Sequence, residues 1–235
     1  MRFVGVDGCR AGWIAAGIDT GFNTELKLFP ELTSLWDEFR DSSVILIDIP
    51  IGLPFSHARE CDILARKILK SRPSSIFPAP CREAVYTSNY KDASMINLKT
   101  LGKKLSVQTW NIIPKIRQAD LLLSSKGDAR RKMHESHPEI CFQSLNKEPL
   151  KNSKKTIPGI NERLQILNNV HPSFTEIYNT ALSRFRRSDV AKDDILDALI
   201  LAVSAASPPE KRRSIPEHPE NDANGIPMKI VYSVS

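Results

Sequence analysis

The first fifty residues have the hydrophobic pattern of a small β-sheet. Three short apolar runs, separated by turn-forming residues, predict antiparallel strands at 3–7, 14–18 and 25–29. Apolar residues then recur at helical spacing over 32–39, which predicts one amphipathic helix. The run at 44–48 is almost continuously apolar, as in a strand that is covered on both faces and parallel to the first. We therefore predict a three-stranded meander, a helix and a buried fourth strand.

The pattern changes to helices with proline-rich breaks over residues 54–132, which predicts a helical cap inserted into the sheet domain. Within it, the stretch 72–82 contains three prolines and is expected to be an extended loop. A helical pattern resumes at 106–123, where Pro114 should force a kink or a restart. Arg59, Asp62 and Arg66 share one face of an earlier helix and are expected to form a salt-bridged surface.

The remaining chain predicts a return to the sheet. Residues 139–142 have strand character and are expected to be the fifth strand. The segment 192–206 is apolar on most of its circumference, so we expect a helix packed on the sheet, with Asp193 as its cap. A polar, mobile tail is predicted at 208–224, and a last short strand at 227–232.

Composition narrows the class of protein only slightly. The chain has 33 basic and 27 acidic residues, a mild excess that makes nucleic acid a candidate partner. No apolar run is long enough to span a bilayer and the first residues do not resemble a secretory signal, so we expect no membrane partner and a cytoplasmic location. The four cysteines are scattered and lack zinc-site spacing, which predicts free thiols.

Acidic residues stand where catalytic carboxylates are often found. Asp7 and Asp48 each end a predicted strand, and Asp194 and Asp197 are three residues apart on the late helix. Burying Asp197 in an apolar helix costs several kcal/mol unless the carboxylate is paired or bound to metal. Carboxylate oxygens are ligands that Mg²⁺ or Mn²⁺ prefers over zinc. We therefore predict a divalent-metal site at these four aspartates.

Two further groups of residues are candidates for the same site. Glu135, His137 and Glu139 lie within five positions and have side chains that carry protons or bind metals, although a strand entry held by hydrogen bonds explains them equally well. The second group is basic and is predicted to bind substrate phosphates. It comprises Arg10, Arg72, Arg82, Lys154 and Lys155.

The predicted order of elements, with carboxylates on the first strand, the fourth strand and the last helix, resembles the ribonuclease H-like fold. The segment DDILDALIL is similar to the DxxDALA helix of Holliday-junction resolvases, with Asp194 and Asp197 at the matching positions. Asp48 takes the acidic place at the tip of their fourth strand, although it is Asp here and Glu there.

A closer resemblance covers nearly the whole chain. The segments that carry it are VGVDGCRAGW, DIPIGLP, RECDILAR, HPEICF, SKKTIPGINER and DDILDALILA, which look like the predicted-nuclease family of domain of unknown function 429. The resemblance implies an α/β, ribonuclease H-like mixed sheet flanked by helices. It also implies a single domain over 1–235 with the helical insertion at about 54–132, and a nuclease or phosphodiesterase dependent on Mg²⁺ or Mn²⁺, of uncharacterised biological role.

Two other classes of function remain open at this point. A non-catalytic nucleic-acid-binding or scaffold protein would need clustered basic residues to bind its partner, but it would not need the converging aspartates. An actin-like or sugar-kinase-like ATPase also ends its first strand in an aspartate. The chain, however, has only one such sheet unit and no second Asp-x-Gly phosphate loop, which argues against ATP cleavage.

Overall fold

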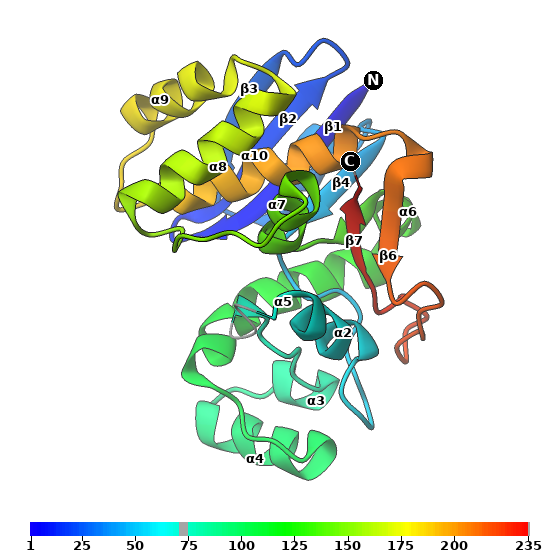
Figure 1. Ribbon diagram of the computed structural model, residues 1–235. Coiled ribbons are helices and arrows are strands. Elements are labelled where there is room, and N and C mark those ends of the chain that lie inside the picture. Colours follow the sequence, from blue (N-terminus) through cyan, green and yellow to red (C-terminus); the bar gives the residue numbers. More distant parts are fainter. Residues whose placement is uncertain (71–74, 235) are drawn as a thin grey trace.

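The computed structural model describes residues 1–70 and 75–234, and within them it has a mixed sheet of five strands flanked by helices (Figure 1). The strand order is β3-β2-β1-β4-β5. The first three strands form an antiparallel meander, whereas β4 and β5 run parallel to β1. The strands are β1 (Arg2–Cys9), β2 (Gly12–Asp19), β3 (Thr24–Phe29), β4 (Val44–Ile47) and β5 (Met133–Glu135). The predicted meander and the parallel fourth strand are confirmed.

Helices cover both faces of this sheet. Helices α1 (Leu32–Phe39) and α5 (Val107–Ser125) share one hydrophobic core with the side chains of Val6 and Ile47. On the opposite face of the sheet, a second hydrophobic core includes residues of the helices that follow β5. These helices are α7 (Pro138–Asn146), α8 (Ile157–Val170), α9 (Phe174–Arg184) and α10 (Lys192–Ala206).

Alternation along the strands decides which face carries the candidate acids. Val6 is paired with Ile47, so Asp7 and Asp48 are the next residues of two neighbouring parallel strands. Successive side chains of a strand point to opposite faces. Because Val6 and Ile47 belong to the core beneath α1 and α5, Asp7 and Asp48 project towards the other face, which α10 covers.

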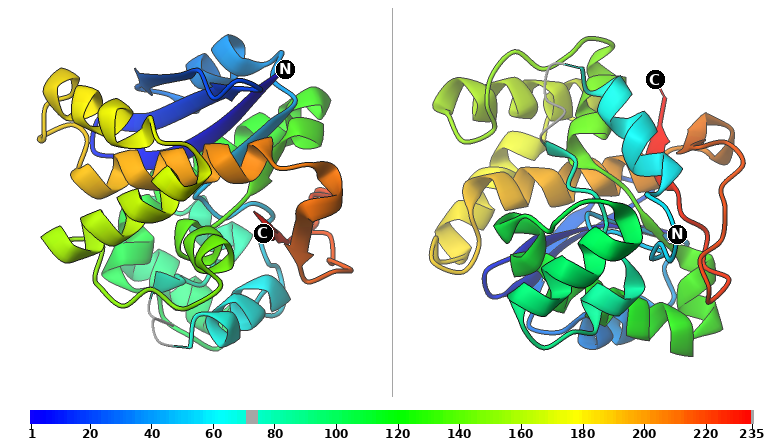
Figure 2. Two further views of the ribbon diagram at one scale, coloured as in Figure 1. Left: turned by 45° about the horizontal axis from the view of Figure 1, so that its top comes forward. Right: turned by 90° about the horizontal axis from the view of Figure 1, so that it is seen from below.

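Helix α10 lies directly on β1, as both views of Figure 2 show. A Cβ atom at Gly5 would lie 2.1 Å from the carbonyl oxygen of Ala198 and 2.1 Å from the amide nitrogen of Ala202. No side chain fits in that space, so glycine is required for the helix to approach the strand this closely.

Helices joined by loops make up the described residues of the insertion between β4 and β5, and most of it forms the lower part of Figure 1. It contains α5, which runs through Pro114 without the predicted restart. The other helices of the insertion are α2 (Glu60–Ile68), α3 (Arg82–Val85), α4 (Tyr90–Leu101) and α6 (Gly127–Lys132).

The segment predicted as the fifth strand is a helix. Pro138 occupies the first turn of α7, a position where its missing N–H costs nothing, and the fifth strand is instead β5. The apolar residues Ile140, Cys141 and Phe142 are consecutive and all buried because this helix lies deep in the structure. An apolar run of that length does not distinguish a buried helix from a strand.

The predicted salt bridge between Arg59 and Asp62 is present, but it is buried and does not lie on the surface. The Arg59 side chain is completely buried and pairs with Asp62 and with Glu135, at 2.5 and 2.6 Å. Its Nη1 also donates to the backbone carbonyls of Ile51 and Gly52. Arg59 therefore joins the start of α2 to β5 and to the chain that leaves β4.

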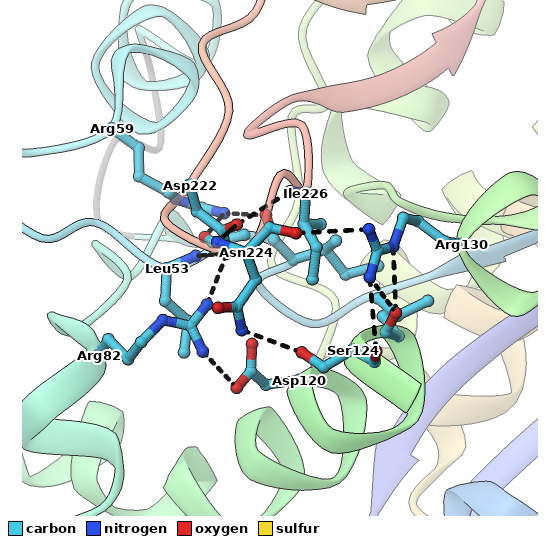
Figure 3. Close-up of polar contacts among 12 residues, drawn as sticks. Leu53, Arg59, Arg82, Asp120, Ser124, Arg130, Asp222, Asn224 and Ile226 are labelled. Carbon is cyan, nitrogen blue, oxygen red and sulfur yellow. Dashed lines mark hydrogen bonds and ion pairs between the residues drawn. The ribbon is translucent and has the colours of Figure 1, made fainter. Parts of the chain in front are cut away.

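The tail predicted to be mobile is ordered and holds the insertion to the rest of the molecule. Strands β6 (Arg212–Ile215) and β7 (Ile230–Ser233) form a second sheet, and the chain between them reaches the cap. The buried carboxylate of Asp222 accepts hydrogen bonds from Arg82 and from the backbone N–H of Leu53 (Figure 3). Arg82 bonds Asp120 of α5 at the same time.

None of the helices among the described residues is both long and apolar enough to cross a lipid bilayer.

The Gly5 contact gives a direct test of the fold. We expect Gly5→Ala to lower the free energy of unfolding by at least about 2 kcal/mol, because the added methyl group forces α10 away from β1. Gly127→Ala is the matched control, since the space around Gly127 is open and Ala favours the helix that begins there. Chemical denaturation of both variants measures the difference, and equal stabilities would contradict the packing described here.

Candidate active site

A cavity of about 950 Å³ lies beside the ends of β1 and β4, between the sheet and the insertion. Its acidic lining comes from distant parts of the chain: Asp7 is near the end of β1, Asp48 follows β4, and Asp193 and Asp194 are in the first turn of α10. Asp197 is one turn further along α10 and is completely buried. The structure thus brings the four predicted aspartates into one neighbourhood.

Asp7 is the most strongly perturbed of these acids. Its side chain is buried, and Oδ1 accepts a hydrogen bond of 2.8 Å from the N–H of Gly8. Burial raises the pKa of Asp7 well above its ordinary value, and the negative charges of Asp197 and Asp48 raise it further. An ionised Asp7 therefore destabilises the folded protein unless a cation is nearby.

Lys154 is the cation that the structure places among the acids. Its Nζ donates to Oδ2 of Asp197 at 2.5 Å and lies 3.7 Å from Oδ2 of Asp193. Burial alone would lower the pKa of Lys154, but Asp197 and Asp7 raise it above its ordinary value. Burial raises the pKa of Asp197 to about 6 against the opposing effect of Lys154. Among the described residues, the other oxygen of Asp197, Oδ1, is buried with no hydrogen-bond partner.

The acids at the start of α10 have different local partners. Asp194 Oδ2 accepts a hydrogen bond of 2.8 Å from the N–H of Ala191, so Asp194, and not Asp193 as predicted, caps the helix. Asp193 instead lies 3.7 Å from the ammonium groups of both Lys154 and Lys155. Burial raises the pKa of Asp194.

Glu135 and Glu139 line the cavity, and each is paired with a completely buried arginine. Glu135 contacts Arg59 at 2.6 Å, and Glu139 forms an ion pair with Arg163 of α8. Burial raises the pKa of Glu135 to about 7, although Arg59 opposes that effect. These ion pairs give both glutamates a structural role, and their predicted part in proton transfer stays a prediction.

The other predicted residues divide between the cavity and the rest of the molecule. His137 lines the cavity, and its Nε2 is 3.2 Å from the carbonyl oxygen of residue 75. The cavity lining also includes Arg10, Lys154 and Lys155. Arg82 does not line it, because its guanidinium is held by Asp120 and Asp222, and Arg72 lies outside the described residues.

Sequence reasoning missed the part of the lining that the insertion supplies. Gln108, Asn111, Ile112 and Lys115 of α5 all face the cavity. Their spacing of i, i+3, i+4 and i+7 is the signal that would have found them, since it places all four on one side of a helix. The ion pairs of Asp193 and Arg163 were missed as well, because their partners are distant in sequence and no local pattern indicates them.

As the side chains lie, no three His, Cys, Asp or Glu residues within 1–70 and 75–234 are grouped closely enough to hold a metal ion. The ammonium groups of Lys154 and Lys155 are positive charges beside these acids.

A sequence model for a protein family, described as "Protein of unknown function (DUF429)", matches residues 5–221. The chain belongs to this family. The DUF429 match includes all four predicted aspartates, Lys154 and the whole helical insertion. No curated protein and no solved structure matches the chain.

The raised pKa of Asp7 predicts how stability depends on pH. Because the folded-state pKa exceeds the unfolded value, the folded protein binds more protons at mildly acidic pH, and its stability falls as pH rises through that window. In EDTA at pH 7.5, Asp7→Asn should therefore raise the melting temperature by at least about 2 °C, and the gain should shrink towards pH 4. Differential scanning calorimetry from pH 4 to 8 measures both effects.

Asp197→Asn is the informative contrast. It removes the partner of Lys154 and leaves the ammonium of this half-buried side chain without its closest compensating charge, so it should lower the melting temperature at pH 7.5. If Asp7→Asn were the destabilising change and Asp197→Asn the stabilising one, the charge arrangement described here would be wrong.

Proposed function

We propose that the protein is a phosphodiester hydrolase of ribonuclease H-like type that acts on nucleic acid and depends on Mg²⁺ or Mn²⁺. One observation carries the proposal. Carboxylates from the end of β1, the residue after β4 and the start of α10 line a single cavity, with Asp197 buried beside them. Asp7, Asp48 and the pair Asp194 and Asp197 come from three distant parts of the sequence and have no local structural need to be neighbours.

The topology supports the ribonuclease H-like part of the proposal. A three-stranded antiparallel meander is followed by two strands parallel to the first, in the order β3-β2-β1-β4-β5, with α10 packed on the central strand.

The residues present fit a divalent cation in the chemistry of their donor atoms, although the described side chains would have to move closer together to hold one. Their oxygen donors are those that Mg²⁺ and Mn²⁺ prefer, and within the described chain the buried Oδ1 of Asp197 lacks a partner. We propose that Asp7, Asp48 and Asp197 would hold the divalent ions, with Asp194 as a further ligand or as the group that orients water. Bound ions would activate a water molecule and stabilise the departing oxygen.

The remaining residues would bind substrate and move protons. Arg10 and Lys155 line the cavity and would hold phosphate charges, as would Lys154 once its contact with Asp197 is released. Of the proposed proton carriers, His137 has a ring nitrogen, Nδ1, that is buried without a hydrogen-bond partner among the described residues. Glu135 and Glu139 are held in ion pairs with arginines, which favours His137 for that role.

The ion pair between Lys154 and Asp197 favours a second candidate function. Lys154 already neutralises part of the acidic charge. A non-catalytic nucleic-acid-binding protein would need such a lysine and no metal ion. Turnover therefore distinguishes the two functions.

The nuclease proposal is tested with single-stranded, double-stranded, hybrid and branched nucleic acids in Mg²⁺ or Mn²⁺. We expect cleavage of at least one substrate by the wild type, and a rate lower by roughly 100-fold or more for Asp7→Asn, because even residues supporting a metal ligand contribute 10- to 100-fold. Asp41→Asn, at an exposed aspartate, is the control and should cut normally. No cleavage of any substrate, or normal cleavage by Asp7→Asn, would leave salt-dependent binding without turnover as the better assignment.

Lys154 gives a test of metal binding that does not need a substrate. Since its ammonium lies among the carboxylates, Lys154→Met should leave their charge uncompensated and strengthen Mn²⁺ binding. The rise in melting temperature on adding Mn²⁺ should then be larger for this variant than for the wild type. Lys155→Met, at a side chain that is 76% exposed, should behave like the wild type. An equal or smaller Mn²⁺ effect in Lys154→Met would argue against a metal site at these acids.

A further inference from the structure

The cavity has a second wall of different chemistry, which the insertion provides. One face of α5 contributes two amide side chains, Gln108 and Asn111, together with Ile112. The opposite face of the helix, which includes Ile113 and Ile116, is buried in the core beneath the sheet. The amides are therefore held in place by a packed helix while their own side chains face open space.

An aromatic ring belongs to the same wall. Phe77 lines the cavity and its side chain is 41% exposed, whereas the preceding Ile76 is buried. A large apolar ring left open to solvent inside a cavity is available for stacking against a planar group.

Lys115 joins this wall to the acids. It lies one further turn along the face of α5 that carries Asn111 and Ile112. Its side chain runs over Gly8, the residue of β1 that follows Asp7, since a Cβ atom at Gly8 would lie 2.9 Å from Cδ of Lys115. The Lys115 ammonium lies 5.3 Å from the ring centre of Trp13. The positively charged Lys115 therefore lies between the wall formed by the insertion and the carboxylates.

We propose that the insertion wall binds one unpaired nucleobase of a single-stranded nucleic acid, whose adjoining phosphate lies at the aspartates. Each part of a nucleotide has a matching group. The ring of Phe77 stacks on the base, the amides of Gln108 and Asn111 contact its edge, and Lys115 neutralises phosphate.

The volume and the position of the wall both favour an unpaired base. The cavity, about 950 Å³, is within the size range of small-molecule sites and accommodates a single nucleotide with its flanking phosphates. In a duplex, the base edges are paired and the ring faces are stacked on neighbouring bases. Phe77 and the amides would then have no free surface to contact. The inference rests on the proposed function, because the aspartates define where the phosphate lies.

Fluorescence anisotropy with a labelled ten-residue oligothymidylate tests the proposal, with Ca²⁺ as the divalent ion. We expect the wild type to bind this strand at least about tenfold more tightly than a duplex of the same length. Phe77→Ala and Asn111→Ala should each weaken binding of the single strand by about tenfold, in the range measured for the loss of one base stack. The matched controls are Phe55→Ala and Asn179→Ala, at exposed residues outside the cavity lining, and they should bind like the wild type.

An abasic strand of equal length distinguishes binding of the base from binding of the phosphates, because it keeps the phosphates and lacks the bases. If the wall binds the base, the wild type should bind the abasic strand at least as weakly as Phe77→Ala binds the normal strand. Phe77→Ala should then discriminate less between the two strands than the wild type does. Wild-type affinity in Phe77→Ala and Asn111→Ala, or equal binding of abasic and normal strands by the wild type, would overturn the proposal.

The outcomes distinguish this inference from the proposed function. Cleavage that depends on Asp7 but is unaffected in Phe77→Ala and Asn111→Ala, together with unchanged binding, would retain the nuclease and reject the base site. Selective loss of single-strand binding in both variants, with no cleavage of any nucleic acid by the wild type, would retain the base site and reject the nuclease.

Discussion

The close contact between α10 and β1 at Gly5 determines most of what the cavity contains. The backbone of the helix lies against the backbone of the strand, with no room for a side chain between them. Asp7 is two residues beyond that contact on the strand, and Asp197 is adjacent to Ala198 on the helix. A larger separation between helix and strand would place these carboxylates further apart, so the mutual effect of their charges follows directly from one glycine.

The cavity is surrounded by buried charges, most of which are already compensated. Arg59 holds Glu135, and Arg163 holds Glu139. Such pairs cost desolvation energy and add little net stability, but breaking one by removing a partner is strongly unfavourable. They therefore fix the cavity lining in one arrangement. Asp7 and Asp48 differ from these glutamates, because no ion pair joins either of them to a described residue.

Local sequence predicted the parts of the fold that depend on local patterns. The apolar runs of the first four strands were recognised because alternation and turn residues are properties of neighbours in sequence, and the strand ends then indicated where Asp7 and Asp48 would meet. The segment at 139–142 was misassigned because a buried helix and a buried strand have the same apolar run. Arg59 was taken for a surface residue because its partner Glu135 is 76 positions away. The amide face of α5 has a helical spacing that was readable, but only the packing of the insertion against the sheet shows that this face borders the acids.

The ion pair of Arg82 with Asp222 joins residues that are 140 positions apart in the chain. During synthesis the ribosome releases the strands of the meander and the helices of the insertion long before Asp222 exists. Until then, Arg82 and the N–H of Leu53 lack the carboxylate that both contact in the finished protein. The insertion thus acquires its last attachment after the sheet has had time to form. The order of translation therefore places this attachment among the last contacts of the molecule to form.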